Sequence, residues 1–201
     1  MVQAICLQNN DAYVRKGEHV DRRSFIETVG LGAVALGLSK QARGQAAAGA
    51  EARIRELGLE LPEPARPVAV YAPYRITGNQ VFVAGNIPPQ DADIPTSGKV
   101  GSDLTIEQGY AAARLAGLRV LAQLRTACGG DLDRVVQALQ IRGFVNCKSD
   151  FEAQPSVVNG ASELFRDVFG DAGLAARAAL GANALPLNAA VEIESIWEIR
   201  T

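Results

Sequence analysis

The chain has 201 residues, with 20 Lys and Arg, 22 Asp and Glu, and a single histidine, His19. Six of the basic and four of the acidic residues precede residue 51, so residues 51–201 carry a net charge of −4, which is opposite to the basic surface that nucleic-acid binding needs. Because His19 also precedes residue 51, residues 51–201 cannot supply Ser-His-Asp or Cys-His catalysis or a His-ligated metal site.

Residues 1–50 have the pattern of a twin-arginine export signal. Arg22 and Arg23 precede an apolar run over 28–39 and an alanine-rich stretch over 46–50. The apolar run is shorter than the roughly 20 residues that span a bilayer, so we expect no stable membrane span. We therefore predict a signal peptide and linker over 1–50, a single domain over 51–201, and a periplasmic or exported location. A mis-assigned start in a cytoplasmic protein remains an alternative, because Asp21 and Glu27 are atypical of such signals.

The domain begins with a short amphipathic helix, whose apolar stripe is Ile54, Leu57 and Leu61. Repeated prolines over 62–67 prevent further helix. Two short extended segments follow, 68–72 and 75–77, and a turn at Gly78-Asn79 leads into a return strand over 80–85. The sequence thus predicts a β-hairpin near the start of the domain, followed by a polar surface loop over 86–101.

Two long helices and three further strands complete the pattern. The first helix covers 105–128, with Ser102 or Asp103 as its expected cap and Gly129-Gly130 as its end. The other predicted elements are a strand over 135–146, a helix over 154–169, and strands over 176–184 and 190–199. This order predicts an α+β fold, in which a mixed sheet of about six strands carries two helices on one face.

The two final strands hold the residues with the clearest chemical potential. Arg177 lies on the first of them and Glu192 on the second, and residues 185–188 form a tight connection. On the last strand the odd-numbered residues 191–199 share one face, and Glu192 lies on the other. A fixed cation and a carboxylate could hold a small anionic substrate and activate water beside it.

Two cysteines, Cys128 and Cys147, lie in the predicted domain without C-x-x-C spacing. In an oxidising compartment they could form a disulfide. Two buried free thiols are the interpretation that the sequence favours.

Three segments resemble the RidA/YjgF family, which has a chorismate-mutase-like fold. They are the hairpin region over 71–88, the helix over 155–169, and the stretch from Arg177 to Ile196 with its Leu-Pro pair and Glu192. The resemblance extends over nearly all of 68–200. It implies a two-layer fold, and a homotrimer with ligand clefts between neighbouring subunits.

The resemblance also implies an activity. Family members of the active type hydrolyse enamine and imine carboxylates, such as 2-aminoacrylate, to keto acids and ammonia without a cofactor or metal. Arg177 matches the arginine that grips the substrate carboxylate, and Glu192 matches the glutamate associated with the attacking water. The residues that match the substrate-binding positions are Arg177, Tyr74, Ala84, Gly85 and Asn159.

Other interpretations remain open at the level of sequence. Ala84 and Ala179 stand where many members carry serine and cysteine, so a non-catalytic trimer that binds small carboxylates is an alternative. A ribonuclease is a third hypothesis, which rests on an older family name and is opposed by the acidic charge. For single residues, Arg177 could form an interface ion pair, Glu192 could be a solvated charge, and Tyr74 and Asn159 could have packing or local hydrogen-bonding roles.

Overall fold

The computed structural model describes residues 49–64, 66–67 and 69–201. The predicted export signal and its cleavage region at 46–50 therefore lie almost wholly outside the described residues. The bounds of the elements are α1 Ala50–Glu56, β1 Tyr74–Thr77, β2 Gln80–Asn86, α2 Ile106–Ala127, η1 Leu132–Arg134, β3 Val135–Asn146, α3 Gln154–Phe169, η2 Gly170–Gly173, β4 Ala176–Ala182, η3 Pro186–Asn188 and β5 Val191–Ile199.

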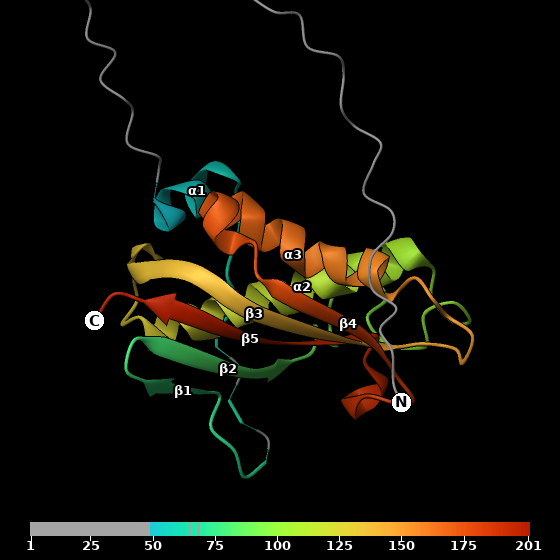
Figure 1. Cartoon of the computed structure of the whole chain (residues 1–201). Coiled ribbons are helices and arrows are strands. Elements are labelled where there is room, and N and C mark those ends of the chain that lie inside the picture. The colour runs from blue at the N-terminus through green and yellow to red at the C-terminus, as the bar shows by residue number, and fades with distance from the viewer. Residues whose placement is uncertain (1–48, 65, 68) are drawn as a thin grey trace, which may run out of the picture. The chain divides into compact units, whose positions relative to one another are not determined.

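The five strands of the described chain form one mixed sheet in the order β1-β2-β5-β3-β4. The β1–β2, β2–β5 and β3–β5 pairs are antiparallel, and the β3–β4 pair is parallel. Helix α3 lies between β3 and β4 in the sequence, which is the connection that a parallel pair requires. In Figure 1, α2 and α3 both lie on one side of the sheet, which confirms the predicted α+β arrangement.

The expected count of about six strands is one too many for the described residues. Residues 69–72 form no strand. The Tyr71 amide donates instead to the Ala69 carbonyl at 3.0 Å, which closes a tight turn. Val70 is fully exposed. The apolar residues of this segment predicted an extended piece, but the turn takes up one N–H and one C=O that a strand would offer to a neighbour.

Helix α2 begins one residue later than expected and has a different cap. Thr105 accepts a hydrogen bond from the Gln108 amide, and the Gln108 side chain accepts one from the Thr105 amide. This is the reciprocal capping box of a Thr-x-x-Gln sequence, which takes the place of the expected caps Ser102 and Asp103. Helix α3 has the bounds that the sequence predicted.

The core lies between the helix pair and one face of the sheet. Trp197 on β5 is fully buried there, and its ring packs against Phe165 and Phe169 of α3 at centroid distances of 5.1 and 5.2 Å. Its indole nitrogen donates to Ser195 Oγ at 2.8 Å, so the polar edge of the ring is satisfied. The helices approach closely because Gly160 has no side chain: a Cβ there would collide with the Tyr110 carbonyl.

The remaining predictions have mixed outcomes. Ile54 of α1 is buried and Leu61 is half-buried, but Leu57 is exposed, so the apolar stripe is shorter than expected. Cys128 and Cys147 are buried free thiols, as the sequence favoured. Within the described ranges, no helix combines the length and the apolar character needed to cross a membrane.

Candidate substrate site

The first part of the site is an arginine held by helix α3. Arg177 lies on β4 opposite the buried Ile141 of β3, so its side chain lies on the helix-covered face of the sheet. Its Nη1 donates to Asn159 Oδ1 at 2.7 Å and to Ser162 Oγ at 3.0 Å. Asn159 and Ser162 are three residues apart and therefore face the same way from α3. We call Arg177, Asn159 and Ser162 the arginine half-site.

The two hydrogen bonds leave the other side of the guanidinium open. Nη1 carries two N–H groups, and Asn159 and Ser162 accept from it. The Nε and Nη2 groups of Arg177 have no partner among residues 49–64, 66–67 and 69–201. This free edge has the paired geometry that binds a carboxylate through two parallel hydrogen bonds.

The second part of the site is a carboxylate on the opposite face of the sheet. Glu192 lies on β5 between Val191 and Ile193, which are both buried against the helices, so its own side chain lies on the uncovered face. The side chain contacts the backbone of Gly85, where an added Cβ would collide with the carboxylate. Ala84 precedes Gly85 on β2. We call Glu192, Gly85 and Ala84 the glutamate half-site.

The environment of Glu192 favours its protonated form. Burial raises the pKa of this carboxyl above its usual value of 4.5, and repulsion from Glu194 on the same face raises it further. Glu192 has no hydrogen-bond or ion-pair partner in the part of the chain that the structure describes. A half-buried carboxyl with a raised pKa can accept a proton and return it nearer to neutral pH than an ordinary glutamate can.

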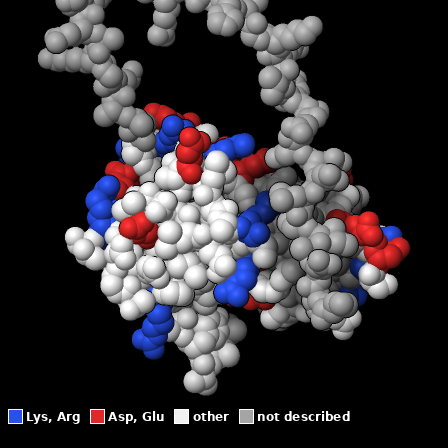
Figure 2. All heavy atoms as spheres, in the orientation of Figure 1, with Lys and Arg blue, Asp and Glu red and all other residues white. Residues whose placement is uncertain are grey.

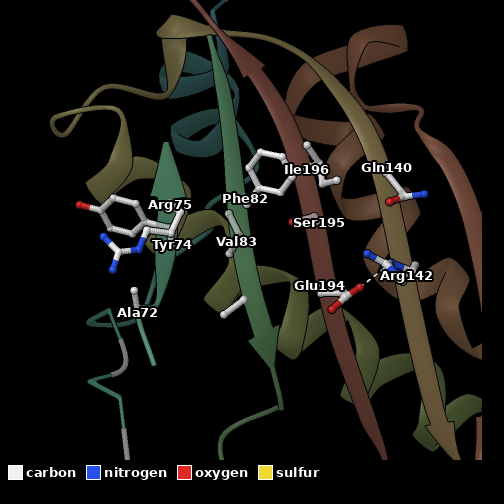
Figure 3. Close-up of a pocket in the computed structure, with 11 residues that line it drawn as sticks. Ala72, Tyr74, Arg75, Phe82, Val83, Gln140, Arg142, Glu194, Ser195 and Ile196 are labelled. Carbon is white, nitrogen blue, oxygen red and sulfur yellow. Dashed lines mark ion pairs between the residues drawn. The ribbon is translucent and has the colours of Figure 1, made fainter. Parts of the chain in front are cut away.

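A cavity of about 260 Å³ adjoins the glutamate half-site on the same face. Its lining includes Ala84, Tyr74 and Phe82 from the hairpin and Glu194 from β5. Figure 3 shows Phe82 beside Ile196, with Arg142 and Glu194 facing each other across two neighbouring strands. The Arg142 Nε lies 2.5 Å from Glu194 Oε1, so these two charged side chains of the cavity form an ion pair with each other.

A polar cluster fixes the connection between the two strands that carry Arg177 and Glu192. Lys99 Nζ donates to Asn146 Oδ1 at 3.0 Å and to the Asn183 carbonyl at 2.5 Å. The amide of the buried Asn146 side chain donates to Asn188 Oδ1 at 3.0 Å. Leu187 and Asn188 both have positive φ, near 55°, so the tight connection uses an uncommon backbone conformation that this cluster stabilises.

The sequence matches a known family over this whole region. The model of a family described as "YjgF/chorismate mutase-like, putative endoribonuclease" covers residues 51–198. The chain belongs to the RidA/YjgF family. A curated relative, Protein TCP17 of Trypanosoma cruzi, is 40% identical over 149 residues, which are 74% of this chain and 92% of the relative.

Two solved structures are similar to the chain. One is Atu1372 of Agrobacterium tumefaciens, a protein of unknown function, with 40% identity and a TM-score of 0.68 over 75% of this chain and 94% of the other. The second, named a "putative endoribonuclease" of Shewanella oneidensis, has 36% identity and a TM-score of 0.71 over 76% of this chain and all of the other. The names of these two proteins do not agree on an activity: one is of unknown function and the other is named an endoribonuclease.

Within one chain of this RidA/YjgF protein, the predicted site residues form two separate groups. Glu192 pairs with Phe144 of β3, which pairs with Leu180 of β4, so Glu192 is level with a residue three positions from Arg177. An offset of three along a strand reverses the face. Arg177 and Asn159 therefore lie on the helix-covered face, and Ala84, Gly85 and Glu192 lie away from them.

Sequence reasoning missed two parts of the site. Ser162 shares the Arg177 guanidinium with Asn159, and its position one helical turn after Asn159 was the available signal. The cavity and its lining residues Arg75 and Arg142 were also missed. They come together only through the register of β1, β2, β5 and β3, which the separate strand patterns do not reveal. Tyr74 is half-buried and lines this cavity.

Proposed function

We propose that the chain is a cofactor-free hydrolytic deaminase that converts small enamine and imine carboxylates to keto acids and ammonia. The observation that carries the proposal is the open Nε/Nη2 edge of Arg177, which Asn159 and Ser162 hold in place. A guanidinium fixed in this way suits a substrate that carries a carboxylate beside its reactive carbon.

The proposed chemistry uses Glu192 to move protons. An enamine first gains a proton from solvent at its β-carbon and becomes the iminium ion. Glu192 takes a proton from water as the water oxygen bonds to the iminium carbon and the C=N π electrons move to nitrogen, which gives a carbinolamine. Glu192 then passes this proton to the amino nitrogen, the C–N bond breaks and ammonia leaves, and the C=O bond forms as the hydroxyl proton is released to solvent. The raised pKa of Glu192 supports this role.

We further propose that the working site lies between copies of the chain in a homotrimer. Arg177 and Glu192 lie on different faces of the sheet, so a composite site needs Arg177 of one copy and Glu192 of the next. The uncovered face of the sheet has an apolar residue outside the cavity that favours association: Leu180 on β4 is 48% exposed. Figure 2 shows a broad uncharged area with charged side chains mainly at its margins.

The activity test supplies imino acids from an amino-acid oxidase and follows keto-acid release. We expect the purified chain to accelerate hydrolysis over buffer, and we expect Arg177→Ala and Glu192→Gln to abolish most of the acceleration. Arg166→Ala is the matched control, because Arg166 is an exposed arginine in the last turn of α3, after Asn159 and Ser162. No acceleration by the wild type, or full activity in Arg177→Ala, would contradict the proposal.

A second candidate is a carboxylate-binding protein without turnover. It is favoured by Ala84 and Ala179, which offer no hydroxyl or thiol at positions where many family members have one. Calorimetry with pyruvate separates the two candidates: binding that requires Arg177, together with no imine hydrolysis, favours the binding protein. A ribonuclease has less support, because residues 51–201 are acidic and lack histidine. RNA cleavage that disappears in Glu192→Ala would favour it.

A further inference from the structure

The cavity beside Ala84 lies next to the proposed reaction centre. Glu192 and Glu194 are on the same face of β5, two residues apart, so the cavity begins about 7 Å along the strand from the proposed base. It then continues across β2 to the edge strand β1. A substrate whose reactive carbon lies at Glu192 would direct its side chain into this space.

Part of the cavity wall is apolar, and the size of the cavity accommodates a short side chain. Phe82 pairs with Ile196 across the β2–β5 ladder, and both line the cavity. Figure 3 shows these two side chains next to each other. The volume of about 260 Å³ is just below the range of roughly 300–1,000 Å³ that is usual for ligand pockets. It therefore has room for a side chain of a few methylene groups and a terminal polar group.

The charges at the cavity are not balanced. Arg142 is paired with Glu194 through its Nε. Arg75, which also lines the cavity, has no hydrogen-bond or ion-pair partner among the described residues. Figure 3 shows its guanidinium at the outer edge of β1, on the side of the cavity remote from Arg142 and Glu194. The cavity thus carries one guanidinium that is available to an anionic ligand.

The register of the hairpin places Arg75 within reach of the Ala84 end. Arg75 pairs directly with Phe82, and Ala84 is two residues further along β2 on the same face. Diagonal neighbours of this kind are about 7–8 Å apart. An apolar stem of two or three carbons, starting near Ala84, would pass over Phe82 and bring a terminal anionic group to Arg75.

We propose that this cavity is the side-chain subsite of the enzyme and that it selects imino acids whose apolar stem ends in a second carboxylate. This inference rests on the proposed deaminase function. Arg177 holds the carboxylate beside the imine carbon, and Arg75 holds the distal carboxylate. Ala84 lines the cavity with a methyl group and no hydroxyl.

The kinetic test compares two imino acids of equal chain length, generated by oxidases from glutamate and from norvaline. We expect the wild type to prefer the glutamate-derived imine by about ten-fold or more in kcat/KM, as one charge-assisted carboxylate contact allows. Arg75→Gln should remove the preference, with a much larger loss of kcat/KM for the glutamate-derived imine than for the norvaline-derived imine, and Arg75→Lys should restore part of it. Arg55→Gln is the control, because Arg55 is an exposed arginine on α1.

A binding test separates failure of this inference from failure of the proposed function. Calorimetry compares glutarate with pentanoate on wild type, Arg75→Gln and Arg177→Ala. If no imine is hydrolysed but glutarate binds more tightly and needs both arginines, the subsite stands without the catalysis. Hydrolysis without preference for the diacid, or equal loss with both imines in Arg75→Gln, would overturn the subsite. Equal binding of glutarate and pentanoate, as expected if Arg75 pairs with a neighbouring copy, would overturn it as well.

Discussion

The arginine and glutamate half-sites differ in how exposed their charged groups are and in whether neighbouring side chains bond to them. Arg177 is exposed, yet two side chains of α3 hold its guanidinium. Glu192 is half-buried, yet no described residue bonds to its carboxylate, and burial and Glu194 raise its pKa. The first arrangement fixes a permanent charge in place, which suits binding. The second destabilises the ionised form of the Glu192 carboxylate, so that it takes up a proton more readily, which suits proton transfer.

The largest expected loss of activity comes from removing the charge of Arg177 or that of Glu192. The two variants can then be combined in one assembly, so that some copies lack one charge and the others lack the second. Arg177→Ala and Glu192→Gln should each lower kcat/KM by about 10²–10³-fold, since Arg177 positions the substrate through its carboxylate and Glu192 moves the proton. Co-expression of the two variants with different tags should give doubly tagged rings with about a third of the wild-type activity, because each mixed ring of three contains one site out of three with both native groups.

This complementation tests whether the half-sites meet between copies. Keto-acid release by doubly tagged assemblies is the measurement, and each singly tagged variant is the control. If the mixed assemblies stay as inactive as the single variants, Arg177 and Glu192 do not work across an interface, and the composite site is wrong.

The next effect concerns the glutamate half-site alone. A Cβ at Gly85 would collide with the Glu192 carboxylate, so Gly85→Ala should displace the carboxylate without changing Arg177. We expect kcat to fall by about ten- to a hundred-fold, as for other small displacements of a catalytic group. Carboxylate affinity, measured by calorimetry, should stay unchanged. A parallel loss of affinity would mean that the two half-sites are not separable.

Much of the fold could be predicted from sequence, because its signals are local. The apolar spacing of α3 and the alternation along β5 each depend on a few neighbouring residues, and both predictions are confirmed. The separation of Arg177 and Glu192 could not be predicted in this way. It depends on the parallel pairing of β4 with β3, in which Arg177 lies opposite Ile141. Likewise, the turn at 69–72 depends on backbone hydrogen bonding that the apolar pattern does not encode.

A smaller effect is expected from the two side chains that hold Arg177, and it tests whether they act in binding or in the chemical step. Asn159→Ala and Ser162→Ala each remove one acceptor from Arg177 Nη1, and a hydrogen bond of this kind contributes about 0.5–1.5 kcal/mol. We expect KM to rise by about two- to ten-fold in each variant, with kcat little changed. Steady-state kinetics with one imine measure both constants. A fall in kcat with unchanged KM would place Asn159 and Ser162 in the chemical step instead.

The smallest effect is a shift of the pH profile. Glu192 acts as a base when ionised, so its raised pKa makes activity fall at a higher pH on acidification than an ordinary glutamate would. Glu194→Gln removes the repelling charge, lowers the Glu192 pKa, and should move the acid limb of kcat/KM to lower pH. Glu198→Gln is the control on the same face of β5, and it should leave the limb in place. A shift to higher pH in Glu194→Gln would contradict this electrostatic coupling.

The buried indole of Trp197 gives the protein a built-in optical reporter. It is the sole tryptophan of the chain, and it packs between β5 and the two phenylalanines of α3. Its fluorescence should therefore follow the melting of the helix–sheet core, while remaining insensitive to events on the opposite face. Subunit dissociation that precedes unfolding would leave the emission spectrum unchanged, so dilution and denaturation can be distinguished in a single cuvette without a label.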